Sequence, residues 1–287
     1  MKSNIIFALL LTFTAISRFF LIDKIPPNLN QVFLTGRILS GGASLVSAVM
    51  VFFLVKKYFG KPKIALLTSW VFSILPWTFE QGRIISQPNL TLALVMSVLF
   101  ICQRVNFQNK KILLFLIPVI FFFLYPQFWI FRVDEFKFNF YSFIYNLFTL
   151  LSFDFLFFKN TSFWWGGVKE SGVMFLSFLP FFLVGIYNII HLVHFRLILL
   201  FLLITAVSAA SRFFPETREF YLSTPILAIV VGLGIYYCFL QTKFAIRIFF
   251  AGLFFLMIYE FSQFYHFYFI HYPQEVRSNF SQIHESF

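Results

Sequence analysis

Apolar runs of about twenty residues alternate with short polar connections along almost the whole chain. A helix of about this length crosses the hydrocarbon core of a bilayer, so each run is typical of a membrane-spanning helix. The pattern predicts nine spanning helices. They cover residues 4–22, 33–55, 64–79, 88–104, 111–131, 172–193, 196–211, 222–240 and 244–264.

Composition supports this interpretation. Of the 287 residues, 60% are hydrophobic and 11% are charged, and the mean hydropathy is +0.85. A soluble domain carries roughly 25% charged residues, so this chain cannot cover itself with a polar surface. We predict an all-α, polytopic transmembrane bundle. Residues 1–264 form one membrane domain, and residues 265–287 form a short extracytoplasmic aromatic tail without a separate soluble module.

Charge predicts which side of the membrane each connection faces. The formal net charge is +11, but the basic residues are spread between apolar runs rather than gathered on one face, which argues against a nucleic-acid partner. With the N-terminus in the cytoplasm and the C-terminus outside, the cytoplasmic side holds eleven basic residues and no acidic one, as the positive-inside rule requires. These are Lys2, Lys56, Lys57, Lys61, Lys63, Arg104, Lys110, Lys111, Arg196, Lys243 and Arg247. We therefore predict an integral protein of the cell membrane.

Two features of the chain ends and cysteines complete this picture. The first apolar run begins like a signal peptide but lacks a small-residue cleavage site, which favours an uncleaved first span. Cys102 and Cys238 both lie in predicted spans, which argues against a structural disulfide.

The segment 132–171 is the least regular part of the pattern. Within it, Ser142, Tyr145, Asn146, Thr149 and Ser152 recur at helical spacing on an otherwise apolar, aromatic stretch. This favours an amphipathic helix, over about 139–153, that lies in the outer interface. The alternative is a tenth span through about 138–158, which would reverse everything downstream and move three basic residues outside. The charge rule disfavours it.

A polar cluster in LPWTFEQGRIISQPNLTL (75–92) separates the third and fourth predicted spans. Pro76 and Trp77 are expected to end the third span at the outer interface, where tryptophan is favoured. Glu80, Arg83 and Gln87 follow at spacings of three and four, so a short helix would align them on one face. Two roles fit Arg83 equally well from spacing alone: it binds a phosphate, or it pairs with Glu80.

Other charged residues gather on the same predicted side. The acidic and basic residues of the outer loops and outer span ends are Arg18, Asp23, Arg37, Glu80, Arg83, Asp134, Glu135, Arg212, Glu216, Arg218, Glu219 and Glu260. His191 and His194 lack a third ligand, so no metal site and no cofactor are predicted. The glycines of SGGAS (40–44) favour close helix packing rather than a phosphate loop.

Three stretches resemble the GT-C glycosyltransferases, and more narrowly the protein O-mannosyltransferase and lipid A aminoarabinose transferase branch. TGRILSGGASLVSAVMVFFLVKKYFGKPKIALLTSWVFSILPWTFEQGRIISQPNLTL resembles their second to fourth spans. RFFLIDKIPPNLN resembles the family's Arg-Phe followed by a Pro-rich loop, and RFFPETREFYLSTPILAIVVGLGIYY resembles its late outer loop and helix. The resemblance implies a polyprenyl-phosphate sugar donor, and a glycan, lipid or protein acceptor approaching from the outer side of the bilayer.

The resemblance also implies residue roles. A carboxylate of the first outer loop would be the general base, and cationic side chains would hold the departing lipid phosphate. That loop reads IPPNLNQVFLTGR without the family's acidic pair, so Asp23 is the candidate base and Glu80 the reserve. The implied substrate-binding residues are Arg83, Gln87, Asn89, Arg212 and Arg218. The alternative is a shortened, non-catalytic member that binds lipid-linked glycan or scaffolds a partner. A transporter would instead need ionisable groups at mid-membrane.

Overall fold

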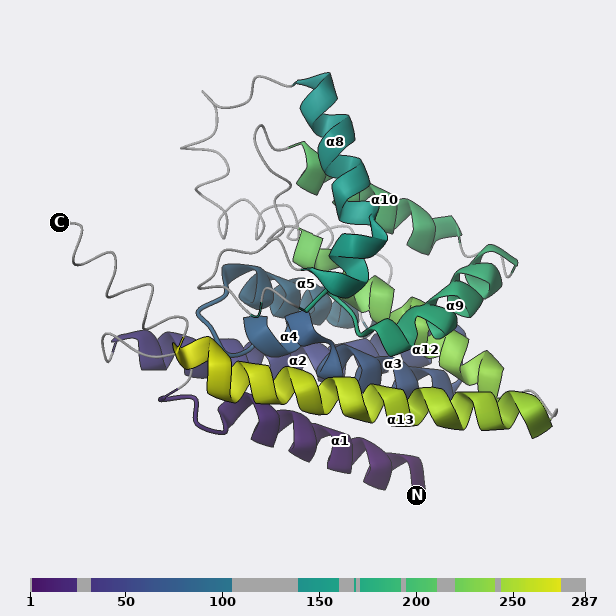
Figure 1. Ribbon diagram of the computed structural model, residues 1–287, viewed down its shortest axis with the longest axis horizontal. Helices are drawn as coiled ribbons and strands as arrows, with labels where there is room; N and C mark the ends of the chain where they lie inside the picture. Colours follow the sequence, from purple (N-terminus) through teal and green to yellow (C-terminus); the bar gives the residue numbers. More distant parts are fainter. Residues whose placement is uncertain are drawn as a thin grey trace.

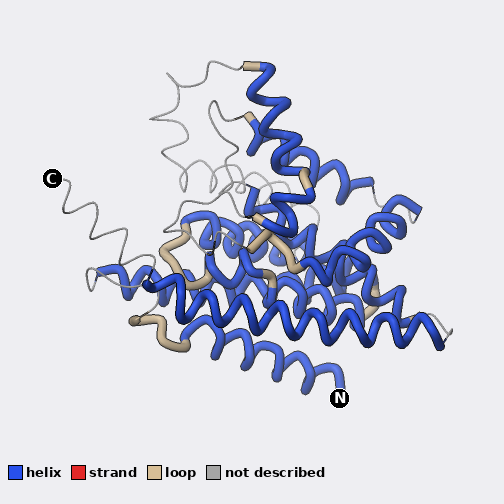
Figure 2. The backbone as a smooth tube through the Cα atoms, viewed as in Figure 1, coloured by secondary structure: helices blue, strands red, loops and turns tan. Residues whose placement is uncertain are grey.

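The computed structural model describes residues 2–24, 32–104, 139–159, 168, 171–191, 195–210, 220–240 and 244–274. Every regular element in these ranges is a helix, which confirms the all-α prediction (Figures 1 and 2). The α-helices are α1 (Lys2–Phe19), α2 (Val32–Phe59), α3 (Pro62–Ile74), α4 (Pro76–Gln81), α5 (Gln87–Arg104), α8 (Phe140–Leu151), α9 (Leu179–His191), α10 (Phe195–Ala209), α12 (Thr224–Phe239) and α13 (Phe244–His266). Short π-helical turns η1 (Asp154–Phe158) and η4 (Phe267–His271), and 3₁₀ turns η2 (Leu176–Phe178) and η3 (Tyr221–Ser223), adjoin them.

Three of these helices are long and apolar enough to cross a membrane. They are Leu34–Phe59, Tyr221–Phe239 and Ile248–Gln274. Other described helices are apolar but shorter, at 10–17 residues. The protein therefore has the character of a membrane protein, while nine spans and their sidedness remain predictions. The predicted span 111–131 lies outside the described residues.

The predicted third span, 64–79, is not one continuous helix. α3 ends at Ile74, Leu75 is extended with φ −53° and ψ 133°, and Pro76 opens α4. Proline has no N–H to continue the α3 ladder, and it disfavours helical geometry in the residue before it. As a result Trp77, predicted for the membrane interface, lies in the protein core and is 2% exposed.

The N-terminal helices form a bundle in which neighbouring contacts define direction. α1 runs antiparallel to α2 and parallel to α13, and Figure 1 shows α1 and α13 side by side. α2 and α5 run parallel. The α1–α2 contacts are Phe7 with Phe52 and Arg18 with Ser44. The α1–α13 contacts are Phe13 with Phe261 and Phe20 with Phe269. The α2–α5 contacts are Ser40 with Asn89 and Phe53 with Phe100. These directions agree with the alternation that the predicted spans imply.

α9 and α12 approach each other so closely that their backbones touch. A Cβ atom on Gly185 would lie 1.9 Å from the Val230 carbonyl oxygen, and one on Gly234 would lie 1.8 Å from that of Phe181. Only glycine fits at both positions. α9 crosses α12 steeply rather than lying alongside it (Figure 1).

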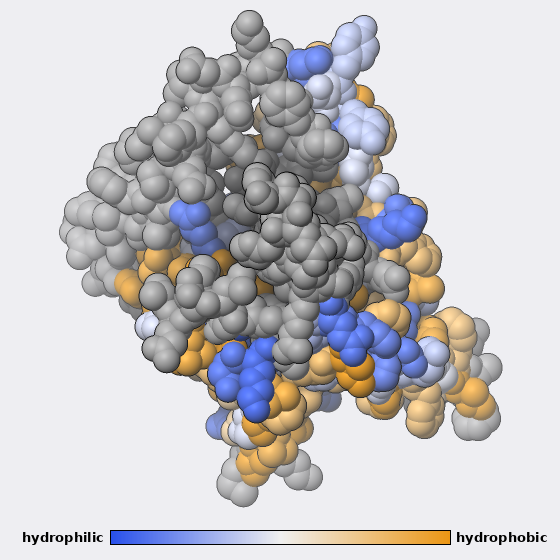
Figure 3. All heavy atoms as spheres, turned by 60° about the vertical axis from the view of Figure 1, so that its left-hand side comes forward, coloured by the Kyte–Doolittle hydropathy of each residue, from blue (hydrophilic) through white to orange (hydrophobic). Residues whose placement is uncertain are grey.

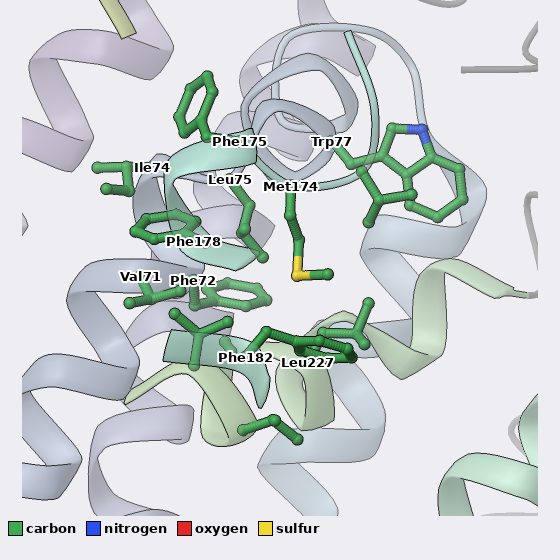
Figure 4. Packing of buried hydrophobic residues seen from close by; sticks show 14 of the residues in the cluster. Val71, Phe72, Ile74, Leu75, Trp77, Met174, Phe175, Phe178, Phe182 and Leu227 are labelled. Atoms are coloured by element: carbon green, nitrogen blue, oxygen red, sulfur yellow. The ribbon is translucent and has the colours of Figure 1, made fainter. Parts of the chain in front are cut away.

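The core connects α3 and α4 to the 173–182 segment and α12. Phe72, Leu75, Phe178 and Leu227 are at most 1% exposed, and the thioether of Met174 lies among these side chains (Figure 4). Burying large aromatic and aliphatic side chains contributes roughly 1.5–3 kcal/mol each. This packing fixes the end of α3, from which the polar cluster follows.

α8 confirms the helix predicted over about 139–153. Asn139 caps it by accepting a hydrogen bond from the Tyr141 N–H at 3.0 Å. Tyr141 and Phe148 are exposed, whereas Asn146 is fully buried against α10 and donates from Nδ2 to the Ala209 carbonyl at 3.2 Å. The polar stripe therefore includes a helix–helix contact, and its position in the interface remains a prediction.

Charged residues separate towards two ends of the bundle. One end, named here the lysine end, carries the exposed Lys56, Lys57, Lys61 and Lys63 where α2 ends and α3 begins. The other, the arginine end, carries Arg18, Arg37 and Arg83 where α1 and α3 end and α2 and α5 begin. Figure 3 turns the arginine end towards the viewer, and the described surface there is mainly apolar with small polar patches.

A candidate site formed by buried arginines

Arg18 and Arg83 are both completely buried, which is costly in an apolar bundle unless their charge is used. Arg18 comes from the last turn of α1, and Arg83 from the turn that follows α4. Gly82 makes this arrangement possible, because a Cβ atom there would lie 2.8 Å from Arg18 Cδ. Both guanidinium carbons lie over the Phe79 ring, at 5.0 and 5.5 Å from its centre.

Arg18 satisfies carbonyl and hydroxyl groups that the helix ends leave open. It donates from Nη2 to the Ser73 carbonyl at 2.7 Å and from Nε to Ser44 Oγ at 3.1 Å. The break at Pro76 leaves the last carbonyls of α3 without helical partners. Arg18 donates a hydrogen bond to the Ser73 carbonyl, and the Thr78 hydroxyl donates one to the Phe72 carbonyl. The hydrogen-bond acceptors of Arg18 are all neutral.

Arg83 caps the C-terminus of α1. It donates from Nη1 to the carbonyls of Ser17 at 2.9 Å and Arg18 at 3.1 Å. A cation at this position also interacts favourably with the helix dipole. Three aromatic rings surround its guanidinium group, since those of Tyr268 and Phe269 join Phe79 at 5.4 and 5.1 Å.

Arg37 also binds a carbonyl near the end of α1, further along the chain than the Arg18 carbonyl that Arg83 binds. It donates from Nη1 to the carbonyl of Ile22 at 3.1 Å, beyond the end of α1. Among the buried residues that the structure describes, the charged side chains are those of the three arginines and Glu80.

Glu80 lies inside the same end of the bundle and is completely buried. Its Oε1 accepts a hydrogen bond from the Val168 N–H at 2.7 Å. The short helix expected to align Glu80, Arg83 and Gln87 is not formed, because α4 ends at Gln81 and α5 begins at Gln87. Arg83 instead occupies a turn closed by its N–H on the Glu80 carbonyl at 2.9 Å.

Asn89 connects three elements and is completely buried. Its Nδ2 donates to the Ser40 carbonyl at 2.7 Å and to Ser40 Oγ at 3.0 Å, joining α5 to α2. Its Oδ1 accepts from the Tyr221 hydroxyl at 3.1 Å, which adds η3. These three hydrogen bonds commit its carboxamide to the protein.

Asp23 lies apart from this interior and is exposed. Leu21, with φ +51°, turns the chain after α1, and Asp23 follows in that turn. Gln87 is partly buried at the start of α5. Arg212 and Arg218 lie outside the described residues. The structure thus brings Glu80, Arg83 and Asn89 together in the interior, and leaves Asp23 at the surface.

Two members of the site were not assigned from the sequence. Arg18 was counted only as an outer charge, although an arginine in the last turn of an apolar helix is a recognisable capping signal. Glu260 was likewise only counted. It lines a cavity of about 200 Å³ between α13 and residues 171–176, which also includes Val168 and Phe264. The cavity adjoins the arginine end, since Val168 binds Glu80 and Phe264 packs on Phe79.

Comparison with known proteins adds no relative. No protein-family model, no curated protein and no solved structure matches the chain.

Proposed function

We propose that this protein is a membrane glycosyltransferase of the GT-C type that binds a polyprenyl-phosphate sugar with its phosphate at the arginine end. One observation carries the proposal: among the residues that the structure describes, Arg18, Arg37 and Arg83 are buried together with one carboxylate, that of Glu80. Three positive charges against one negative charge in a water-poor environment favour an anion. A lipid phosphate in the bilayer is an anion that could reach such a site.

The capping contacts of Arg18 do not neutralise its charge. Carbonyl and hydroxyl oxygens accept hydrogen bonds from Arg18, but they are neutral. A guanidinium group has five N–H donors, and its planar fork suits phosphate oxygens. Capping fixes the position of each cation in advance, which lowers the cost of organising a phosphate site.

The proposed chemistry is an inverting transfer. The acceptor hydroxyl oxygen forms a bond to the anomeric carbon as the bond from that carbon to the phosphate oxygen breaks. The hydroxyl proton passes to a carboxylate, and the negative charge that develops on the phosphate is stabilised by arginine. Asp23 is the proposed base because its side chain is exposed, and Glu80 is the reserve. Gln87, Arg212 and Arg218 remain proposed contacts to the donor.

A binding protein without catalysis is the second candidate, and one observation favours it. Glu80 is fully buried and already accepts the Val168 N–H, so it is poorly placed to receive a proton from an incoming hydroxyl. In that case the arginine end would hold a lipid-linked glycan for another membrane protein.

The test separates donor binding from transfer. The full chain, purified in neutral detergent, is titrated with undecaprenyl phosphate and with undecaprenol, which lacks only the phosphate. We expect Arg83→Lys to weaken phosphate binding about tenfold or more, because it retains the charge but loses the bidentate fork. Binding of undecaprenol should change little, whereas the melting temperature should fall because Arg83 also caps α1. Lys57→Gln, at the exposed lysine end, is the control.

A transfer assay with a polyprenyl-phosphate sugar and a panel of acceptors completes the test. Asp23→Asn should lower the rate by about 10²–10⁴-fold without weakening donor binding. Donor binding without transfer, together with an unaffected Asp23→Asn, would establish the binding protein instead. Equal affinity for undecaprenol and its phosphate would exclude both candidates.

A further inference from the structure

Among the described residues that line the cavity beside α13, Glu260 is the one with a charged side chain. Glu260 is residue 13 of the 27 in the candidate span Ile248–Gln274, so it lies at mid-span. An ionisable residue at that depth is costly and marks a functional site by default. The charge at the cavity wall is therefore unlike the exposed charges of the loops.

The carboxylate of Glu260 is incompletely satisfied. Its Oε2 accepts one hydrogen bond, from the Ser177 N–H at 2.9 Å. Within the described ranges, no lysine, arginine or histidine forms an ion pair with it. A cation that enters the open cavity would compensate this half-buried carboxylate more fully than one neutral donor does.

Several aromatic residues line the cavity together with Glu260. The rings are those of Phe157, Phe175, Tyr259, Phe264 and Phe267. Metal ions such as Ca²⁺ take six or more oxygen ligands, which this lining does not offer. Aromatic faces instead attract weakly hydrated organic cations. We propose that this cavity binds the ammonium head of an amphiphile, with Glu260 as its counter-charge and the surrounding rings as cation–π partners.

The size and position of the cavity suit a head group attached to an apolar stem. Its volume of about 200 Å³ is below the roughly 300–1,000 Å³ of pockets that enclose a drug-sized molecule. α13 is largely uncovered, and Phe255 and Tyr259 beside the cavity are 72% and 61% exposed. An alkyl chain would lie along this apolar helix face while the head enters. The cavity adjoins the arginine end through Val168 and Phe264, but this proposal does not rest on the function proposed for that end.

Photolabelling of the full chain tests the proposal. The protein is held in dodecyl maltoside, whose head is an uncharged sugar, and is labelled with a diazirine-bearing dodecylammonium. Mass spectrometry should map the label to residues 171–176 and 259–267. Excess dodecyltrimethylammonium should displace it, and dodecanol and dodecyl sulfate should not. Competition by dodecanol equal to that by the ammonium would overturn the proposal.

Two variants test the role of the charge. Glu260→Gln keeps an acceptor for the Ser177 N–H and should reduce labelling at least about tenfold. Gln263→Glu adds a carboxylate to the exposed edge of the cavity and should increase labelling. Ser262→Glu adds one on the same helix outside the cavity and should have no effect. Unchanged labelling in Glu260→Gln, or equal increases in the other two, would refute a specific site.

Discussion

Replacing Asn89 with alanine should destabilise the protein by about 4–6 kcal/mol. The substitution removes three buried hydrogen bonds, two to Ser40 and one from Tyr221, at roughly 1 kcal/mol each. It also leaves the Tyr221 hydroxyl, on a residue that is 1% exposed, without its acceptor, which costs about 1–3 kcal/mol more. The lower part of this sum is expected, because neighbouring groups relax partly.

A double-mutant cycle isolates the second contribution. Tyr221→Phe removes the hydroxyl itself, so Asn89→Ala should cost about 1–2 kcal/mol less in that background than in the original chain. Melting temperature and denaturant titration in neutral micelles measure the four proteins. A single-mutant cost below about 0.5 kcal/mol, or strict additivity of the two substitutions, would show that this network does not join α2, α5 and η3.

Two further predictions concern packing and sidedness. Gly234→Ala should destabilise the protein by about 1–3 kcal/mol or more, because its Cβ would lie 1.8 Å from the Phe181 carbonyl oxygen. The control Gly252→Ala, with open space around it, should be neutral or slightly stabilising. Equal melting temperatures for the two variants would contradict the close contact of α9 and α12. Cysteines introduced at Ser142 and Lys243 should react with a membrane-impermeant maleimide from opposite sides of the membrane, and labelling of both from one side would refute the predicted topology.

The hydrophobic pattern anticipated most of the helices, because an apolar run without proline or turn residues has few alternatives in a bilayer. The pattern did not predict the break at Leu75. Pro76 is visible in the sequence, but a proline that ends a span and a proline within a packed bend give the same local signal. The burial of Trp77 within the protein core was not anticipated either. Its burial depends on the rings of Phe155, Phe220 and Tyr221, which come from distant segments.

The candidate site was less predictable than the helices. The spacing of Glu80, Arg83 and Gln87 implied a shared helix face, but Gly82 and the turn after α4 separate them. Spacing within one segment could not reveal that Arg83 reaches the end of α1, since that contact joins residues 65 and 66 positions apart. The cavity at Glu260 depends on residues 171–176 packing beside α13, and it has no counterpart in any local pattern.

The capping of α1 by Arg83 also bears on how the protein is made. Arg18 finds Ser44 and Ser73 only after 26 and 55 more residues have been synthesised, and the carbonyls at the end of α1 receive Arg83 later still. Until then, the first helix carries a cation and carbonyls that lack these partners. Residues 2–83 must therefore all be synthesised before these contacts of the first helix can form. A nascent chain that stops between Ser73 and Arg83 would expose its N-terminal helix to the quality-control machinery of the membrane.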